Sequence, residues 1–446
     1  MFEVVDEVLR RARRAGARGA EVYAERAHTR RIKVYRQRVE EISVALRRGV
    51  GLRVFQDGAV GYAYTSDLSL RSLDDLVARA LGNASVTDPD PYAHLPTPQG
   101  EPAPVDVYDP LLAQATDEER IAVGLRLEQA ALSYDRRVKT VEDTVYADSD
   151  AEVFLANSAG VRGSYRESDC YAFAYVLAEQ DGQVETGLSF TVGRNPNQLT
   201  PEACGSEAAQ RACDLLGARK IASMRATVVL DPFVAASFLS VLSSALTADA
   251  VQKGRSLFAG REGQLVASEI VTLSDDGVHP DGLASAPFDG EGTPCQRTLL
   301  IEDGVLQGFL YDTYTANKAG RASTGNGLRA SYASLPSVRP TNLVVEGPPT
   351  PLAQVIGGIE HGVLVTDAVG VHSGANPISG EFSVGVNGLL IESGRLAGGV
   401  HEVTLASDIV SMLKGIVAMG DDARWVPSGS ILTPSLVIEG VSIGGV

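Results

Sequence analysis

The spacing of apolar residues at the start of the chain predicts an amphipathic helix. One helical face collects Phe2, Val5, Val8, Leu9 and Ala12. The same stretch carries acidic residues at positions 3, 6 and 7, which transit peptides avoid. We therefore expect a structural helix here and not a targeting signal.

Residues 31–66 change to a β pattern rich in branched and aromatic side chains, with Asp57-Gly58 as a hairpin turn. The run SLRSLDDLVARALG then predicts a helix that ends with Gly82 as the C′ residue. After it, residues 87–115 are Pro-rich and without period. This composition is typical of a linker or of a chain wrapped over a surface.

A second block, residues 116–220, repeats this mixture of helix and strand. Thr116 and Glu119 have capping-box spacing at the start of a helix that runs to about Leu132. Strands follow through VKTVEDTVYADSDAEVFLANS and SYRESDCYAFAYVLAEQDG. A helix from Pro201 to Leu216, stopped by Gly217, closes the block. Both blocks place strands before a helix, which hints at duplication.

From residue 221 onward, Gly-rich strand pairs predominate, with turn signals at Asp303-Gly304 and Ser393-Gly394. Helices are predicted only in DPFVAASFLSVLSSAL, TPLAQVIGGIE and SDIVSMLKGIVAMG. Long β-runs beside segregated helices predict an α+β fold. The expected units are an N-terminal α/β block at 1–86, the Pro-rich linker 87–115, a second α/β block at 116–220 packed with the first, and a β-rich domain at 221–446.

The segment DPFVAASFLSVLSSAL, residues 231–246, is a helix without an ionisable side chain after its first residue. Asp231 is placed to cap it, and Pro232 fits the first turn. The uncharged run from Pro232 to Ala248 is short and rich in Ser and Thr, which argues against a span of a bilayer about 30 Å thick. A buried core helix is expected, and no membrane association.

The net charge of −17 over 446 residues argues against a general nucleic-acid binder, because such proteins neutralise phosphates with Lys and Arg. The first fifty residues nevertheless hold an excess of basic side chains, which form either a groove for an acidic partner or a solvated face. Four scattered cysteines include no CxxC pair. We read them as reduced structural thiols in a cytoplasmic protein.

Candidate chemistry is sparse. The nearest approach to a metal constellation is His361, Asp367 and His372, and no HExxH motif occurs. Acidic pairs at 275/276, 289/291, 302/303 and 421/422 lie beside glycines, as turn carboxylates do. The Gly-rich stretches 323–327 and 370–388 offer backbone N–H nests for an anion or an extended peptide. Cys170 and Cys295 are interpreted as core residues.

Several ordered stretches resemble the TldD/PmbA family, in which PmbA is also called TldE. The longest are EGTPCQRTLLIEDGVLQGFLYD and NPISGEFSVGVNGLLIESG, and PTNLVVEG and MGDDARW lie in the same order. The resemblance covers nearly the whole chain. It implies an N-terminal α/β domain and a C-terminal domain built on a large, mostly antiparallel sheet.

The resemblance further implies dimers that enclose a channel, often one TldD-type subunit with one TldE-type subunit. It implies proteolysis of unfolded or leader peptides, with zinc in the TldD-type chain. The family also carries an older label, modulator of DNA gyrase. In TldD-type chains, the helix that corresponds to residues 231–246 carries a motif resembling HExxxH. Aligned with that motif without gaps, this chain has Ser240 and Ala245 at the two His positions and Val241 at the Glu position. Ser428 stands where a further Cys ligand is often found.

These replacements favour a TldE-like subunit without zinc or another cofactor, paired with a TldD-type subunit or with a second copy. It would shape the channel and hold peptide by strand addition. The residues expected to touch peptide are Asn376, Pro377, Ser379, Gly380 and Phe382. One alternative is a self-sufficient peptidase using His361, Asp367 and His372, or Cys295 as nucleophile; a second is a regulator linked to DNA gyrase.

Overall fold

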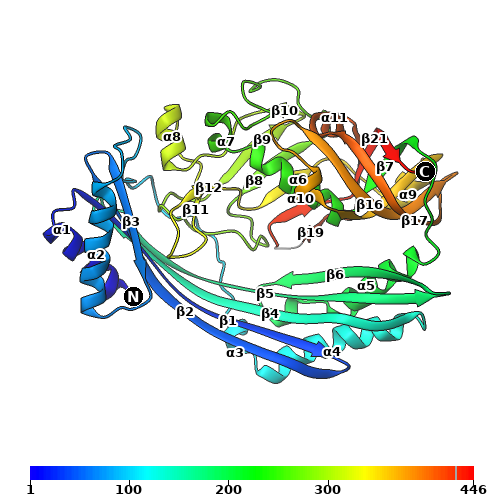
Figure 1. Ribbon diagram of the computed structural model, residues 1–446, viewed down its shortest axis with the longest axis horizontal. Coiled ribbons are helices and arrows are strands. Elements are labelled where there is room, and N and C mark those ends of the chain that lie inside the picture. The colour runs from blue at the N-terminus through cyan, green and yellow to red at the C-terminus, as the bar shows by residue number, and fades with distance from the viewer. Residues whose placement is uncertain (427–428) are drawn as a thin grey trace.

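Long antiparallel strands from the first half of the chain form one twisted six-stranded sheet (Figure 1). The computed structural model describes residues 1–426 and 429–446. The strand order is β3-β2-β1-β4-β5-β6. The strands are β1 Gly19–Tyr35, β2 Arg38–Gln56, β3 Ala59–Thr65, β4 Val138–Asn157, β5 Arg162–Gln180 and β6 Gln183–Gly193. Because β1 pairs with β4 from Glu21↔Asn157 onward, residues 1–86 and 116–220 share this sheet.

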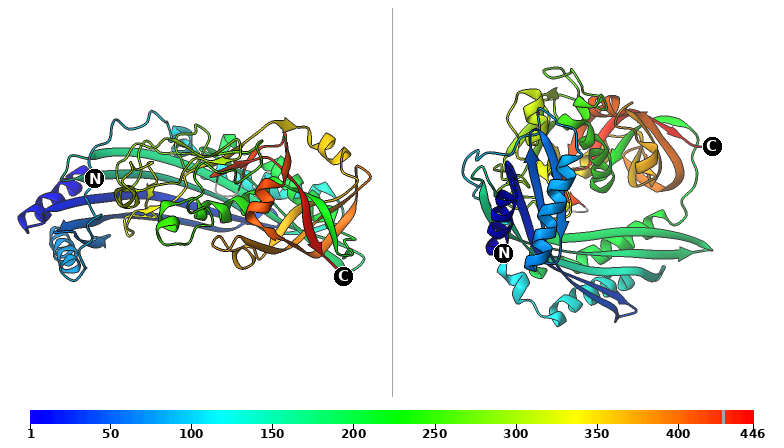
Figure 2. Two further views of the ribbon diagram at one scale, coloured as in Figure 1. Left: turned by 90° about the horizontal axis from the view of Figure 1, so that it is seen from above. Right: turned by 60° about the vertical axis from the view of Figure 1, so that its left-hand side comes forward.

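The helices of the first half cover one face of the sheet. Small and branched side chains of β4 and β5 pack there against α4 and α5, while Val22, Leu52 and their neighbours pack against α1 and α2. The helices are α1 Phe2–Arg14, α2 Leu70–Ser85, α3 Pro110–Gln114, α4 Asp117–Tyr134, the 3₁₀ turn η1 Pro196–Gln198 and α5 Pro201–Leu215. The opposite face of the long strands lies beneath the C-terminal half (Figures 1 and 2).

The C-terminal half contains two larger sheets, with orders β10-β9-β8-β13-β20-β19 and β14-β18-β21-β17-β16-β15-β7. Since β7 pairs with both β15 and β21, strands β7, β15, β16, β17 and β21 close into a ring. The strands are β7 Met224–Leu230, β8 Thr272–Asp276, β9 Arg297–Glu302, β10 Val305–Leu306, β11 Gly327–Leu328, β12 Ser337–Val338, β13 Leu343–Glu346, β14 Pro349–Thr350, β15 His361–Val369, β16 Glu381–Glu392, β17 Arg395–Asp408, β18 Ile416–Gly420, β19 Arg424–Val426, β20 Ile431–Thr433 and β21 Leu436–Gly444.

Short helices connect these strands, and the α+β class is confirmed. They are α6 Pro232–Ala245, α7 Ala248–Gln252, α8 Thr313–Ala319, α9 Leu352–Gly357, α10 Val371–Gly374 and α11 Ile409–Lys414. The uncharged helix α6 lies in the largest hydrophobic core, where Phe238 meets the ring of Phe382 on β16 edge-on at 5.5 Å. None of the described helices combines the length and apolarity that a membrane crossing requires.

The local signals read from the sequence largely correspond to observed caps and turns. Asp231 caps α6 through its contact with the Val234 N–H, and Thr116 with Glu119 forms the capping box of α4. Asp57, Asp303 and Ser393 adopt positive φ at the tips of hairpins, each followed by a glycine. Each of these signals depends on residues a few positions apart, so it can be recognised in the sequence without knowledge of the tertiary structure.

The helices α7, α8 and α10 were not predicted, and two further local predictions are wrong. Gly82 does not end its helix, because α2 continues to Ser85. The run SDIVSMLKGIVAMG is a helix only as far as Lys414, and Ile416–Gly420 instead forms β18 on the edge of β21. In the second case tertiary pairing overrides a helical pattern that is too short to be stable alone.

The Pro-rich segment 87–115 runs along both halves of the molecule. The carbonyl of Pro96 accepts a hydrogen bond from Asn157 on β4 (2.7 Å), and the N–H of Ala103 donates to Pro287 in the C-terminal half (2.8 Å). The carbonyl of Val107 accepts from Ser168 N–H and from the Arg194 guanidinium. The segment therefore connects the sheet to the domain above it.

Candidate functional site

The three positions aligned with a zinc motif lie on two sides of α6. Ser240 and Val241 line a cavity of about 500 Å³, together with Pro340, Thr341 and other residues of the C-terminal half. Ala245 is 0% exposed and belongs to the hydrophobic core. The side chains at positions 240 and 245 therefore point to different surroundings, the first to the cavity and the second to the hydrophobic core. Ser428, the fourth position, lies outside the described residues.

The dispersed candidates His361, Asp367 and His372 do not form a metal site in the part of the chain that the structure describes. His361 and Asp367 are six residues apart on β15, a separation of about 20 Å along a strand. Asp367 instead accepts a hydrogen bond from Asn387 (3.1 Å). His372 lies in α10, but its side chain is outside the description. Among the described residues, no group of three or more His, Cys, Asp and Glu side chains is placed to hold a metal ion.

Cys295 is a core thiol. It is buried, and its Sγ lies 3.6 Å from the Gly325 carbonyl, to which it donates. Burial, with nearby Asp289 and Asp275, raises the pKa of this thiol well above its ordinary value. Because the thiolate is the nucleophile, a thiol held neutral in this way is poorly suited to attack a peptide bond. Cys170 is likewise buried with a raised pKa.

The Gly-rich stretch 323–327 binds carboxylates of the protein itself. Gly327 N–H donates to Asp289 (2.8 Å), and the Asn326 amide donates to Asp275 (2.6 Å). Asp275 also accepts from the N–H and hydroxyl of Thr341. Burial raises the pKa of Asp275 to about 7 despite these donors. The predicted nest is therefore occupied by internal side chains.

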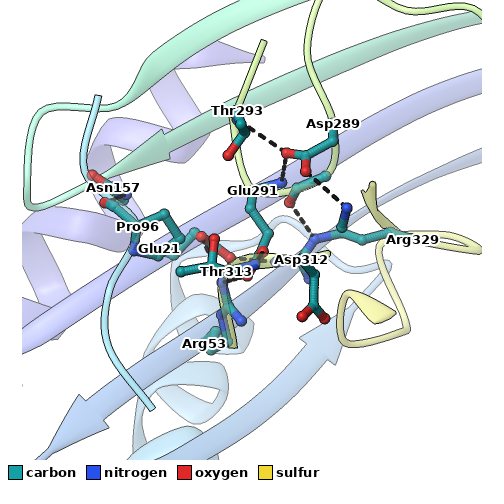
Figure 3. Close-up of polar contacts among 12 residues, drawn as sticks. Glu21, Arg53, Pro96, Asn157, Asp289, Glu291, Thr293, Asp312, Thr313 and Arg329 are labelled. Carbon is teal, nitrogen blue, oxygen red and sulfur yellow. Dashed lines mark hydrogen bonds and ion pairs between the residues drawn. The ribbon is translucent and has the colours of Figure 1, made fainter. Parts of the chain in front are cut away.

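A buried polar cluster joins the two halves of the molecule (Figure 3). It consists of Glu21, Arg53, Asp289, Glu291, Asp312, Thr313 and Arg329. Arg53 on β2 donates to Glu21 (3.1 and 2.9 Å) and to Glu291 (2.9 Å), which lies in the loop between β8 and β9. Arg329 pairs with Glu21 from the other side. Glu291 thus connects the sheet to the C-terminal half.

The pair Asp289/Glu291 was predicted to serve as turn carboxylates, and only Asp289 does so. Its Oδ1 accepts from the N–H groups of Glu291 (2.9 Å) and Thr293 (3.0 Å). Burial and the adjacent Glu291 raise the pKa of Asp289. Burial also pushes the pKa of Glu291 upward, but Arg53 and the Thr313 N–H outweigh it, so the net pKa is lowered. We place one negative charge on Glu291, opposite Arg53.

The face of the N-terminal sheet that lies beneath the C-terminal half carries a row of polar and aromatic side chains. Since residues two apart on a strand share a face, Glu167, Asp169, Tyr171 and Phe173 of β5 point away from the helices that cover Cys170 and Ala172. A cavity of about 710 Å³ lies over this row. It is lined by Asp169, Tyr171, Phe173, Leu188, Phe190, Val192, Leu283, Ala284 and Ser430.

This cavity shares lining residues with two others. Ser430 also lines the cavity beside α6, and Ala284 also lines a cavity of about 230 Å³ that contains Glu167. The three cavities therefore form a row between the sheet and the C-terminal half, from Ser240 on α6 to Glu167 on β5. We call this row the groove. Its length and mixed apolar and acidic lining suit an extended chain better than a compact small molecule.

The segment predicted to touch peptide has two parts. The Asn376 side chain accepts hydrogen bonds from the N–H groups of Ile378 (2.9 Å) and Ser379 (3.3 Å). The residues around Pro377 therefore form a turn, and its tip is exposed. Gly380, which ends the turn, has a φ of +85°. Phe382 is 2% exposed and packs in the core. Val371, which precedes the turn, lines the cavity beside α6. Only the turn at 376–379 is thus available to a partner.

Fold and site together define a two-part α+β protein with a groove between a long antiparallel sheet and a C-terminal domain of two sheets. Family models match three stretches: PmbA/TldA metallopeptidase domain 1 at 20–84, the central domain at 110–216 and the C-terminal domain at 223–445. The chain belongs to this PmbA/TldD metallopeptidase family.

Individual relatives cover almost the whole chain. It is 29% identical to the metalloprotease PmbA of Escherichia coli O157:H7, over 95% of this chain and 92% of the relative. It is 26% identical to a metalloprotease TldD homolog of Haemophilus influenzae, over 91% and 89%. The crystal structure of TldE from Thermococcus kodakarensis superposes with a TM-score of 0.91 at 23% identity, over 99% of this chain and 100% of that one.

A further solved structure carries a different name. The putative modulator of a DNA gyrase from Thermotoga maritima superposes with a TM-score of 0.91 at 26% identity, covering 99% of this chain and 100% of that chain.

Proposed function

We propose that this chain is the non-metal, TldE-like subunit of a TldD/TldE-type peptidase in the cytoplasm, and that it holds unfolded or leader peptides in the groove. The observation that carries the proposal is the composition of α6. It presents Ser240 and Val241 to the cavity, where neither can bind zinc as His does or act as the base that an activated water needs. Relatives named metalloprotease PmbA and TldE support the assignment.

Catalysis is assigned to a zinc-bearing TldD-type partner subunit. If the chain instead pairs with a second copy of itself, the role of that homodimer is limited to binding peptide. A holding role is supported by the apolar floor of the groove and by the carboxylates of Glu167 and Asp169 at one end of it. A peptide lying there would bury side chains on Tyr171, Phe173 and Leu188. The turn at 376–379 is the place where the chain could also pair with peptide backbone.

A role at DNA gyrase has less support in the molecule. Several basic side chains of the first fifty residues are engaged in ion pairs, among them Arg10 with Glu7, Arg18 with Asp57 and Arg26 with Glu152. Binding to nucleic acid needs cations that are free to neutralise phosphates. The gyrase name is therefore not adopted for this chain.

Mixing the purified chain with a zinc-bearing TldD-type relative tests the proposal. We expect a complex of higher mass by light scattering and a changed rate of cleavage of an unfolded peptide. Leu188→Lys, which places a charge in the groove, should alter the cleavage rate and leave the mass of the complex unchanged. Val184→Lys is the matched control, because it lies on the same strand and face but outside the lining residues. Unchanged mass and unchanged rate on mixing would refute the proposal.

A further inference from the structure

Two carboxylates at one end of the groove lack partners. Glu167 and Asp169 lie two residues apart on β5 and point to the same face. Across the described residues, no hydrogen bond or ion pair reaches either side chain, whereas Ser168 between them is bonded on the other face to Arg194 O (3.2 Å). Burial raises the pKa of Glu167 to about 7 and that of Asp169 to about 6. A cation placed between them would relieve this cost.

The protein cation whose charge acts on both carboxylates is Arg194, and its terminal nitrogens are bonded elsewhere. Arg194 is held by three carbonyl groups, those of Val107 (2.9 Å), Ser168 (3.2 Å) and Gly282 (2.6 Å). These bonds fix the guanidinium between the Pro-rich segment, the sheet and the C-terminal half. Its charge weakens the repulsion between the two carboxylates but makes no direct bond to them. The carboxylates therefore remain available to a ligand.

Apolar surface adjoins the carboxylates directly. Tyr171 and Phe173 continue the same face of β5, with ring centroids 6.4 Å apart and planes 14° apart. Tyr171 and Leu188 are 39% and 40% exposed, so both present apolar surface to the cavity. An aromatic or aliphatic side chain laid on this surface would remove apolar area from water.

We propose that the groove selects extended peptides in which a Lys or Arg lies two or four residues from an aromatic or large aliphatic residue. The cation sits between Glu167 and Asp169, and the apolar side chain packs on Tyr171, Phe173 and Leu188. The spacing follows from the strand, because residues opposite 167–169 and 171–173 on one face are two or four positions apart in an extended chain. This specificity rests on the peptide-holding function proposed above.

Fluorescence anisotropy with labelled unstructured peptides tests the proposal on the full chain. The probes share one sequence with a central Phe and carry Lys, acetyl-Lys or Glu two residues before it. We expect the Lys peptide to bind about tenfold more tightly than the other two, corresponding to one charge-assisted contact. The double variant Glu167→Gln/Asp169→Asn should lose this preference, while Glu179→Gln on the same strand, exposed and outside the lining residues, should keep it.

The outcomes separate the specificity from the holding function. Equal binding of the Lys, acetyl-Lys and Glu peptides to the unmodified chain would overturn the specificity and leave the holding function standing. Failure of all peptides to bind would overturn both. Tyr171→Ala should weaken the Lys and Glu peptides alike; no effect of that variant would refute the apolar half of the site. Because the acetyl-Lys comparison needs no variant, misfolding of the double variant would not prevent the test.

Discussion

Replacing Arg53 by methionine is expected to lower the free energy of unfolding by about 3–5 kcal/mol. Arg53 is the cation between Glu21 and Glu291, all three being buried. Without it, Glu21 keeps Arg329, but among the described residues Glu291 keeps the Thr313 N–H as its one remaining donor. A buried carboxylate left in this way loses the charge that offsets its desolvation. The substitution would therefore weaken the contact between the N-terminal sheet and the C-terminal half.

Urea denaturation followed by circular dichroism and by Trp425 fluorescence measures this loss, since Trp425 is the single tryptophan of the chain. Arg18→Met is the control, because its pair with Asp57 is exposed on both sides and is expected to leave the midpoint within experimental scatter. Adding Glu291→Gln to Arg53→Met should restore part of the stability by removing the uncompensated charge. A loss below about 1 kcal/mol for Arg53→Met would show that the cluster does not join the two halves.

Replacing Phe238 by alanine is expected to cost about 3–5 kcal/mol, because it leaves a cavity where α6 meets the closed ring of strands. Phe238 is fully buried and contacts Phe382 edge-on. The same denaturation experiment measures the loss, and Ser240→Ala on the cavity side of the helix should stay within about 0.5 kcal/mol of the unmodified chain. Comparable effects of the two variants would contradict the division of α6 into a core side and a groove side.

Elements defined by neighbouring residues could be predicted from the sequence. The capping box of α4, the cap of α6 and the Asp-Gly and Ser-Gly turns depend on side chains a few positions apart, and each is observed. The helical pattern at 407–420 was misread after Lys414, because β18 exists only through its pairing with β21. Long-range pairing of this kind leaves no local signal.

The site was harder to predict because its residues meet only in the fold. Arg53 and Glu291 are separated by 238 positions, and nothing in the sequence associates them. The groove floor did leave a signal: from Glu167 to Tyr175, polar and aromatic residues alternate with Ser, Cys and Ala. That alternation is typical of a strand whose small residues pack beneath helices on one face and whose larger residues contact another part of the protein on the other face. The sequence does not indicate which part of the chain covers this second face. The fold shows that the C-terminal half does so.

Elemental analysis of the chain, purified without added metal and without an affinity tag, tests most directly whether this subunit is the non-metal member of its complex. We predict no stoichiometric zinc, in keeping with Ser240 and Val241 on the groove side of α6 and Ala245 in the core. Stoichiometric zinc that survives dialysis would contradict the proposed role and would mean that this chain holds the metal with ligands of its own.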